Sequence, residues 1–128
     1  MSFTNDFETR TLQWVFTTGS PTRPTEWHLA LYTVAPSDTG GGTEVSTSGT
    51  AYAREAVTFT VSGNTATNAS AIEYATATAT FGTVVAVGVF DASTSGNLIA
   101  YANLSANKTI ETGDILRIPA GDLDVTLD

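Results

Sequence analysis

The stretch TVVAVGVFDASTSGNLIAYANL, residues 83–104, decides the fold. Its first part, Thr83–Phe90, is the most apolar run of the chain and carries valine on both faces, a pattern typical of a strand buried in the centre of a sheet. The turn-forming run Asp91–Asn97 follows, with Asp91 as an Asx-type turn residue, and Leu98–Leu104 is again strand-like. Together these parts predict a β-hairpin.

Further strands are expected on both sides of this hairpin. In Glu26–Val34 apolar residues occupy both faces, which predicts a second covered strand. The remaining predicted strands are residues 51–61, 65–68, 71–75, 75–80, 108–111, 114–119 and 122–128, with 108–111 and 114–119 forming a pair. About eight short strands at this spacing predict an all-β fold, an antiparallel β-sandwich or jelly-roll-like barrel.

One N-terminal α-helix is expected in addition, over Asp6–Thr17. Thr4 or Asn5 caps it, and Asn5 with Glu8 resembles a capping box. Its residues fall on two neighbouring faces, Phe7, Thr11, Trp14 and Val15 on one and Leu12 and Phe16 on the other. We expect this wide apolar surface to wedge into the core of its own domain; the alternative is that part of it packs on another subunit.

The length of 128 residues predicts a single β-sandwich domain over 1–128, made of a helix arm (1–19) and a β core (20–128). Residues 1–19 have acidic residues where a signal peptide has basic ones, so no signal peptide is expected. No apolar run approaches the roughly 20 residues of a membrane helix.

Composition supports β structure and limits the partners. The chain has 24 Thr and 17 Ala, charged residues make up only 14%, and the formal net charge is −8. Thr favours strands, and the negative charge argues against nucleic acid or an anionic membrane as partner. Of the scattered basic residues, Arg54 and Arg117 lie in predicted strands, where they are expected to pair with Glu55 or Glu73. Arg54 is also a candidate anchor for the carboxylate of a neighbouring copy.

No catalytic motif is present, and we predict no enzyme and no cofactor. His28 is the only histidine, there is no cysteine, and no G-x-S-x-G elbow occurs. The run Gly40–Gly42 lacks the G-K-[ST] of a phosphate-binding loop. It lies instead in a loop, Pro36–Thr50, whose length indicates a functional or mobile segment.

Acidic residues near the end of the chain leave two alternatives open. Asp122 and Asp124 share a strand face, where they could act with Asp128 or Glu111 as a glycosidase pair or in a structural calcium site. The interpretation we favour is a solvated sheet edge whose charges discourage unwanted strand addition.

Several stretches resemble a family of small tailed-bacteriophage virion proteins commonly labelled tail fibre proteins. They are FTNDFETRTLQWVF, HLALYTVAPSDTGGGTEV, AYAREAVTF, FGTVVAVGVFDASTSGNLIAYANL and KTIETGDILRIPAGDLDVTLD, and the most specific parts are Val89–Ala92 and Gly121–Asp128. The resemblance spans nearly the whole chain and implies a structural component of a virion, with no catalytic residues.

Within that family we expect a capsid decoration (cement) protein on the outer surface of the head, because the chain lacks the repeats of a long fibre. The first alternative is a tail fibre or tail-associated protein, and the second is a carbohydrate-binding module using Trp27, Tyr52, Tyr74 and Tyr101. Expected partners are the major capsid protein or tail proteins and copies of the chain itself, most simply as a homotrimer, assembled in the host bacterial cytoplasm. The predicted interaction residues are Phe7, Leu12, Trp14, Phe16, Gly40, Gly41, Gly42 and Arg54.

Overall fold

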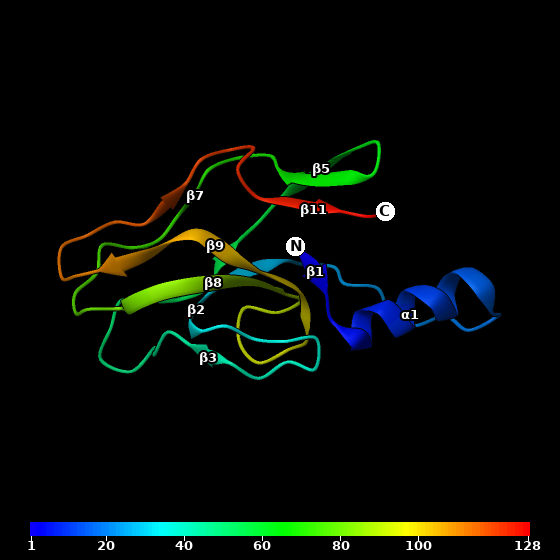
Figure 1. The fold of residues 1–128 in the computed structure, drawn as a ribbon, viewed down its shortest axis with the longest axis horizontal. Coiled ribbons are helices and arrows are strands. Elements are labelled where there is room, and N and C mark those ends of the chain that lie inside the picture. The colour runs from blue at the N-terminus through cyan, green and yellow to red at the C-terminus, as the bar shows by residue number, and fades with distance from the viewer.

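The computed structural model describes all 128 residues and contains eleven strands and one helix (Figure 1). The helix is α1 (Asn5–Phe16). The strands are β1 (Ser2–Phe3), β2 (His28–Val34), β3 (Thr43–Glu44), β4 (Glu55–Ala56), β5 (Phe59–Ser62), β6 (Thr65–Asn68), β7 (Ile72–Glu73), β8 (Gly82–Phe90), β9 (Leu98–Ile110), β10 (Arg117–Ile118) and β11 (Asp124–Thr126).

The predicted hairpin forms the centre of the main sheet. This antiparallel sheet has the order β1-β9-β8-β2-β3, and β4 also pairs with β2. The hairpin register runs from Gly82 opposite Ile110 to Phe90 opposite Leu98. The apolar strand β8 therefore lies between two neighbours, which explains why valine occupies both of its faces.

A second layer covers one face of the main sheet. It consists of a three-stranded sheet, β11-β6-β5, and the pair β10-β7, which lie above β2, β8 and β9 in Figure 1. Between the layers is a cluster of 16 buried apolar residues to which both contribute, including Leu29 and Val84 from the main sheet and Ile72 and Leu123 from the second layer. The predicted antiparallel sandwich with an N-terminal helix is confirmed.

The helix forms where expected, but the prediction that it wedges into the core is wrong. None of its residues is buried, and α1 extends from one end of the sandwich as an arm (Figure 1). Only Phe7, in its first turn, packs against the core. The capping box is also absent: Thr4 is the N-cap, and its side chain bonds to β9 rather than to the helix.

Three strand predictions are wrong because tertiary contacts override the local pattern. The alternating run 75–80 contains no strand; Ala77 instead exchanges backbone hydrogen bonds with Asp114 and Gly113. Residues 98–104 and 108–110 belong to one long strand, β9, and the predicted partner of 108–111 pairs elsewhere, as β10 with β7. The predicted strand 51–61 divides into β4 and β5, which belong to different sheets.

Candidate functional site

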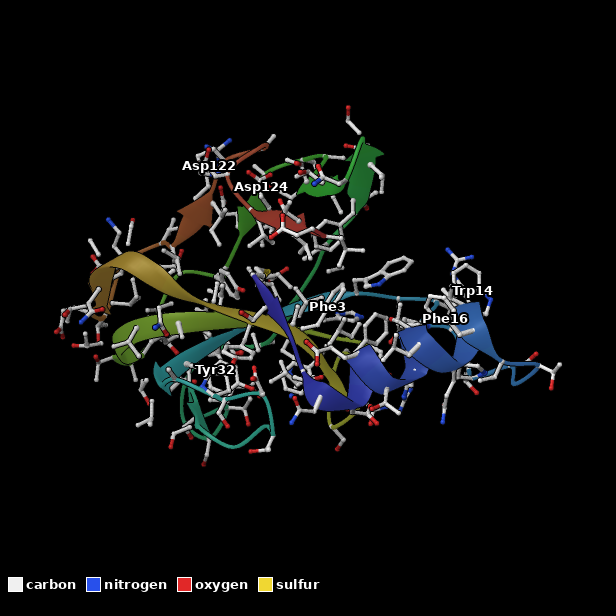
Figure 2. The ribbon with its side chains drawn as sticks, turned by 45° about the vertical axis from the view of Figure 1, so that its right-hand side comes forward. Phe3, Trp14, Phe16, Tyr32, Asp122 and Asp124 are labelled. Carbon is white, nitrogen blue, oxygen red and sulfur yellow. The ribbon has the colours of Figure 1, made fainter.

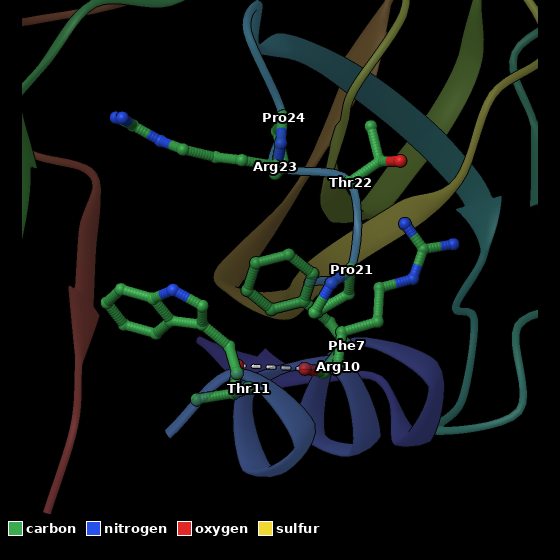
Figure 3. A pocket seen from close by; sticks show the side chains of 8 residues that line it. Phe7, Arg10, Thr11, Pro21, Thr22, Arg23 and Pro24 are labelled. Atoms are coloured by element: carbon green, nitrogen blue, oxygen red, sulfur yellow. Dashed lines mark hydrogen bonds between the residues drawn. The ribbon is translucent and has the colours of Figure 1, made fainter. Parts of the chain in front are cut away.

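The arm has two parts, the helix α1 and the chain that returns beside it. Residues 17–27 run back from the tip of the helix toward β2, and a groove of about 530 Å³ lies between the two parts (Figure 3). Its helical wall is formed by residues at i, i+3, i+4 and i+7 spacing, which share one helix face. The groove is lined by Phe7, Arg10, Thr11, Trp14, Pro21, Thr22, Arg23 and Pro24.

The base of the arm is fixed firmly to the main sheet. The Oγ1 hydroxyl of Thr4 donates to the Leu98 carbonyl at 2.7 Å, and the Thr4 amide donates to the Ile99 carbonyl at 3.0 Å. Phe3 and Phe7 place their ring centroids 5.1 Å apart. Because Thr4 is buried, these bonds are shielded from water and set the direction in which the arm leaves the sandwich.

The tip of the arm presents large apolar side chains to solvent. Leu12, Val15 and Phe16 lie at i, i+3 and i+4 spacing and form what we call the outer face of α1, with 58%, 55% and 78% of each residue exposed. Trp14, 70% exposed, lies on the groove side (Figure 2). Four of the eight large exposed apolar residues of the chain therefore occupy five consecutive positions, the kind of concentration that marks interaction surfaces.

The predicted glycine loop lies at the base of the arm rather than at its tip. Gly40 and Gly41 line a hollow of about 370 Å³ together with Asn5 and Tyr32. The loop is held in place, since the Asn5 amide donates to the Asp38 carbonyl at 2.9 Å and the Tyr101 hydroxyl donates to the Asp38 carboxylate. This hydrogen bond raises the pKa of Tyr101. The loop is thus an ordered part of the surface around the arm.

Gly42 has a structural role that its two neighbours lack. All three glycines adopt positive φ, but only at Gly42 would a Cβ atom meet backbone, 2.6 Å from the Val34 carbonyl oxygen and 2.8 Å from the Pro36 nitrogen. At Gly40 and Gly41 the same space is open. The chain therefore needs glycine at position 42 to pass close to the end of β2.

Arg54 is bound within its own chain. Its Nε and one Nη donate to the two carboxylate oxygens of Glu44 at 3.0 and 2.8 Å, and the other Nη donates to the carbonyls of Ala92 and Ser95. The guanidinium carbon lies 3.6 Å from the centroid of the Phe90 ring. The predicted pairing of Arg54 with Glu55 or Glu73 is wrong, although Arg117 does lie 3.8 Å from Glu73. With four of its N–H groups used, Arg54 is poorly placed to anchor another copy.

The electrostatics of this pair follow from its position. Burial alone would raise the pKa of Glu44, but hydrogen bonds from Arg54 and from the Tyr52 hydroxyl outweigh it, and the pKa is lowered. Burial, with the nearby Glu44 carboxylate, raises the pKa of Tyr32 to about 12. Arg54 and Glu44 are therefore a charged structural pair that joins β3 to the turn after β8.

The residues considered for other functions lie apart from the arm or inside the core. Asp122, Asp124 and Asp128 are exposed, and no group of three or more acidic, histidine or cysteine residues is placed to hold a metal ion. Tyr52 and Tyr74 are buried, with their hydroxyls bonded to Glu44 and to the Leu29 carbonyl. Their rings stack on each other in the core and are closed to a sugar.

Comparison with known proteins adds the family. A family model described as "Podophage GP4 fiber I protein gp80" matches residues 2–126. The chain belongs to this family. The match to the fibre protein family spans nearly the whole chain and agrees with the resemblance seen in the sequence. Membership of this family makes the chain a bacteriophage virion structural protein. No curated protein matches the chain. The helix of this fibre-family protein is too short and too polar to cross a membrane.

The structure thus brings some of the predicted interaction residues together and separates others. The arm contains Phe7, Leu12, Trp14 and Phe16, and the loop with Gly40–Gly42 lies at its base. Arg54 lies outside this region and is bonded to Glu44. Sequence reasoning missed the return segment Pro21–Pro24 as the second wall of a groove. A signal was available, since two prolines within four residues favour an extended chain that cannot continue a helix.

Proposed function

We propose that this protein is a tail-fibre component of a bacteriophage particle and that the outer face of α1 attaches it to a neighbouring virion protein. The single observation that carries the attachment site is the exposed apolar cluster at the tip of an arm whose base is fixed to the sheet. The description of the family as a fibre protein supports the tail. The partner in this proposal is another structural protein of the same virion, on the outer surface of the particle.

The role is structural rather than catalytic in this proposal, and it needs no cofactor. The polar side chains that are well buried serve the fold: Asn68 bonds Ser70, Pro119, Gly121 and Leu123, and Thr4 bonds β9. Function would then depend on interface area, and a specific contact needs roughly 1,200–2,000 Å² in total.

Replacing the outer face tests the attachment. In the triple variant Leu12→Ser, Val15→Ser, Phe16→Ser, we expect an unchanged β-sheet spectrum by circular dichroism and loss of the protein from purified particles, measured by quantitative mass spectrometry. The matched control replaces three equally exposed apolar residues outside the arm, Val34, Val61 and Ile115, by Ser. Full incorporation of the arm variant would contradict the proposal.

Head decoration is the second candidate, favoured by the short chain without repeats. Immunogold labelling of intact particles separates the two positions. Label on the tail supports the fibre assignment, and label over the head shell would replace it by decoration. The test of the outer face does not depend on this result, because it measures whether the protein is incorporated into particles and not where on the particle it lies.

A further inference from the structure

The groove of the arm carries positive charge in a strongly acidic protein. Two of the five basic residues, Arg10 and Arg23, line it, although the formal net charge of the chain is −8. Arg10 lies 3.0 Å from Asp6, whereas Arg23 is exposed and forms no ion pair. Arg54 and Arg117 pair with acids elsewhere. Arg23 therefore contributes an unpaired positive charge to the groove, next to its apolar walls.

The chemistry of the groove defines what fits it. The side chains of Phe7 and Trp14 give the groove an aromatic wall. Pro21 and Pro24 on the opposite wall have no backbone N–H group, so they cannot donate a main-chain hydrogen bond to a bound segment. A complementary segment would be extended, bring carboxylates to the arginines, and place an aliphatic side chain against the aromatic wall. Arginine suits this role because its fork of N–H groups matches a carboxylate.

The closing segment of the chain, residues 122–128, has this chemistry. Asp122, Asp124 and Asp128 are exposed and form no ion pair, and Leu127 is an exposed aliphatic residue in the same extended stretch. In its own chain the segment is held against β6 and the turn at Asn64, and no hydrogen bond or ion pair joins it to its own groove. The Asp124 carboxylate accepts a hydrogen bond from the Thr67 hydroxyl at 2.6 Å, whereas the carboxylates of Asp122 and Asp128 form no hydrogen bond or ion pair and are free for another molecule.

We propose that the groove binds the acidic segment 122–128 of a second copy of this chain. Figure 1 shows that β11 and the arm point toward the same end of the molecule. A symmetric arrangement at that end lets each copy give its segment and receive its neighbour's, so both contacts form together. This inference rests on the proposed function in one respect, that the arm takes part in assembly. It assigns the groove to contact between copies of the chain and leaves the outer face for the other virion protein.

Charge reversal on the purified chain tests this contact. Light scattering after size exclusion should give the wild type at least twice the 13.3 kDa of one chain. Arg23→Glu should reduce it to one chain, and so should the double variant Asp122→Arg, Asp128→Arg. The matched control, Lys108→Glu, makes the same charge change on exposed β9 and should keep the wild-type mass. Arg23 is exposed, so an unchanged melting temperature checks that Arg23→Glu remains folded.

Mixing the two reversed proteins identifies the contact itself. In an equimolar mixture of Arg23→Glu with the double aspartate variant, each groove meets a segment of opposite charge, and the complex should form again. A contact within one chain cannot give this result. The proposal is overturned if the wild type is a monomer at about 1 mM, where a Kd of that size would show, if Arg23→Glu still associates, or if the mixture stays monomeric. No other virion protein is present, so these outcomes leave attachment through the outer face untouched.

Discussion

At the scale of single residues, Arg54 shows how one shielded cation holds three segments together. Its side chain is only 9% exposed and joins Glu44 of β3 to the backbone of the turn after β8, above the ring of Phe90. The sequence indicated an arginine of importance but suggested the wrong partner, because Glu44 is ten positions away and becomes a neighbour only when β3 pairs with β2.

We expect Arg54→Ala to lower the free energy of unfolding by about 2–4 kcal/mol, because it removes the two Arg54 donors and the countercharge from the Glu44 carboxylate, which keeps only the Tyr52 hydroxyl, and leaves two carbonyls without their donor. Arg54→Lys should recover only part of this, since an ammonium cannot form the two-pronged contact. Urea unfolding measures both. The control, Arg117→Ala, removes an exposed pair and should cost less than about 1 kcal/mol. Equal losses at the two positions would contradict the structural role of Arg54.

The pH dependence of stability should follow the lowered carboxyl pKa values. The pKa of Glu44 lies below its ordinary 4.5 because hydrogen bonds from Arg54 and Tyr52 outweigh the effect of burial. The pKa of Asp91 lies below 3.8 because hydrogen bonds from Asn97 outweigh the effect of burial there. Both carboxylates therefore stabilise the fold above these ordinary values, and the stabilisation is lost as the pH falls through the lowered values.

In thermal melts between pH 6 and pH 2.5, Glu44→Gln should therefore weaken the dependence of the melting temperature on pH. It should also be less stable than the wild type at pH 6. The exposed Asp122→Asn variant serves as the control and should keep the wild-type slope. An unchanged slope in Glu44→Gln would show that another group carries the acid sensitivity.

At the scale of elements, the glycine loop gives a matched pair of substitutions. Gly41→Ala introduces a side chain at positive φ into open space and should cost about 1–2 kcal/mol. Gly42→Ala adds a close approach to the Val34 carbonyl oxygen and should cost more, at least about 2 kcal/mol. Urea denaturation compares them, and equal losses would mean that the backbone at Gly42 moves to accept a Cβ.

Elements also show what a sequence pattern can and cannot predict. The helix was predictable because its spacing and its stop at Gly19–Pro21 are local, yet its projection from the sandwich was not, since a wide apolar face suits a core or a partner equally. Residues 75–80 alternate like a strand, but the core receives only Ala77, and no neighbouring strand is available to pair with them. The two-residue strands exist only through their partners, so periodicity could not reveal them.

At the scale of the whole molecule, both layers share one core, so we expect a single cooperative unfolding transition. Trp27 packs against this core, whereas Trp14 stands in the arm. In Trp14→Phe, the fluorescence of Trp27 and the far-ultraviolet circular dichroism should therefore give the same urea midpoint. In Trp27→Phe, the fluorescence of Trp14 should change little on unfolding. Two separate midpoints in Trp14→Phe would show that the layers unfold independently.

The overall architecture was largely predictable, because the Thr83–Leu104 hairpin and the turn at Ser62–Asn64 carry strong local signals. For the candidate site, the sequence could predict some of the residues but not the groove that they form. The sequence indicated Phe7, Trp14 and Phe16, but the groove needs the return segment beside the helix, a contact that no periodicity encodes.

The long strand β9 also has a mechanical consequence. The base of the arm is bonded to Leu98 and Ile99 at one end of β9, which then continues to Ile110 beside β8. Interstrand hydrogen bonds lie across the strand axis, so a pull on the arm along β9 loads the whole ladder in shear, many bonds at once, instead of opening them one after another. In the proposed attachment through the outer face of α1, β9 would transmit tension from the arm to the loops at its far end while its hydrogen bonds share the load.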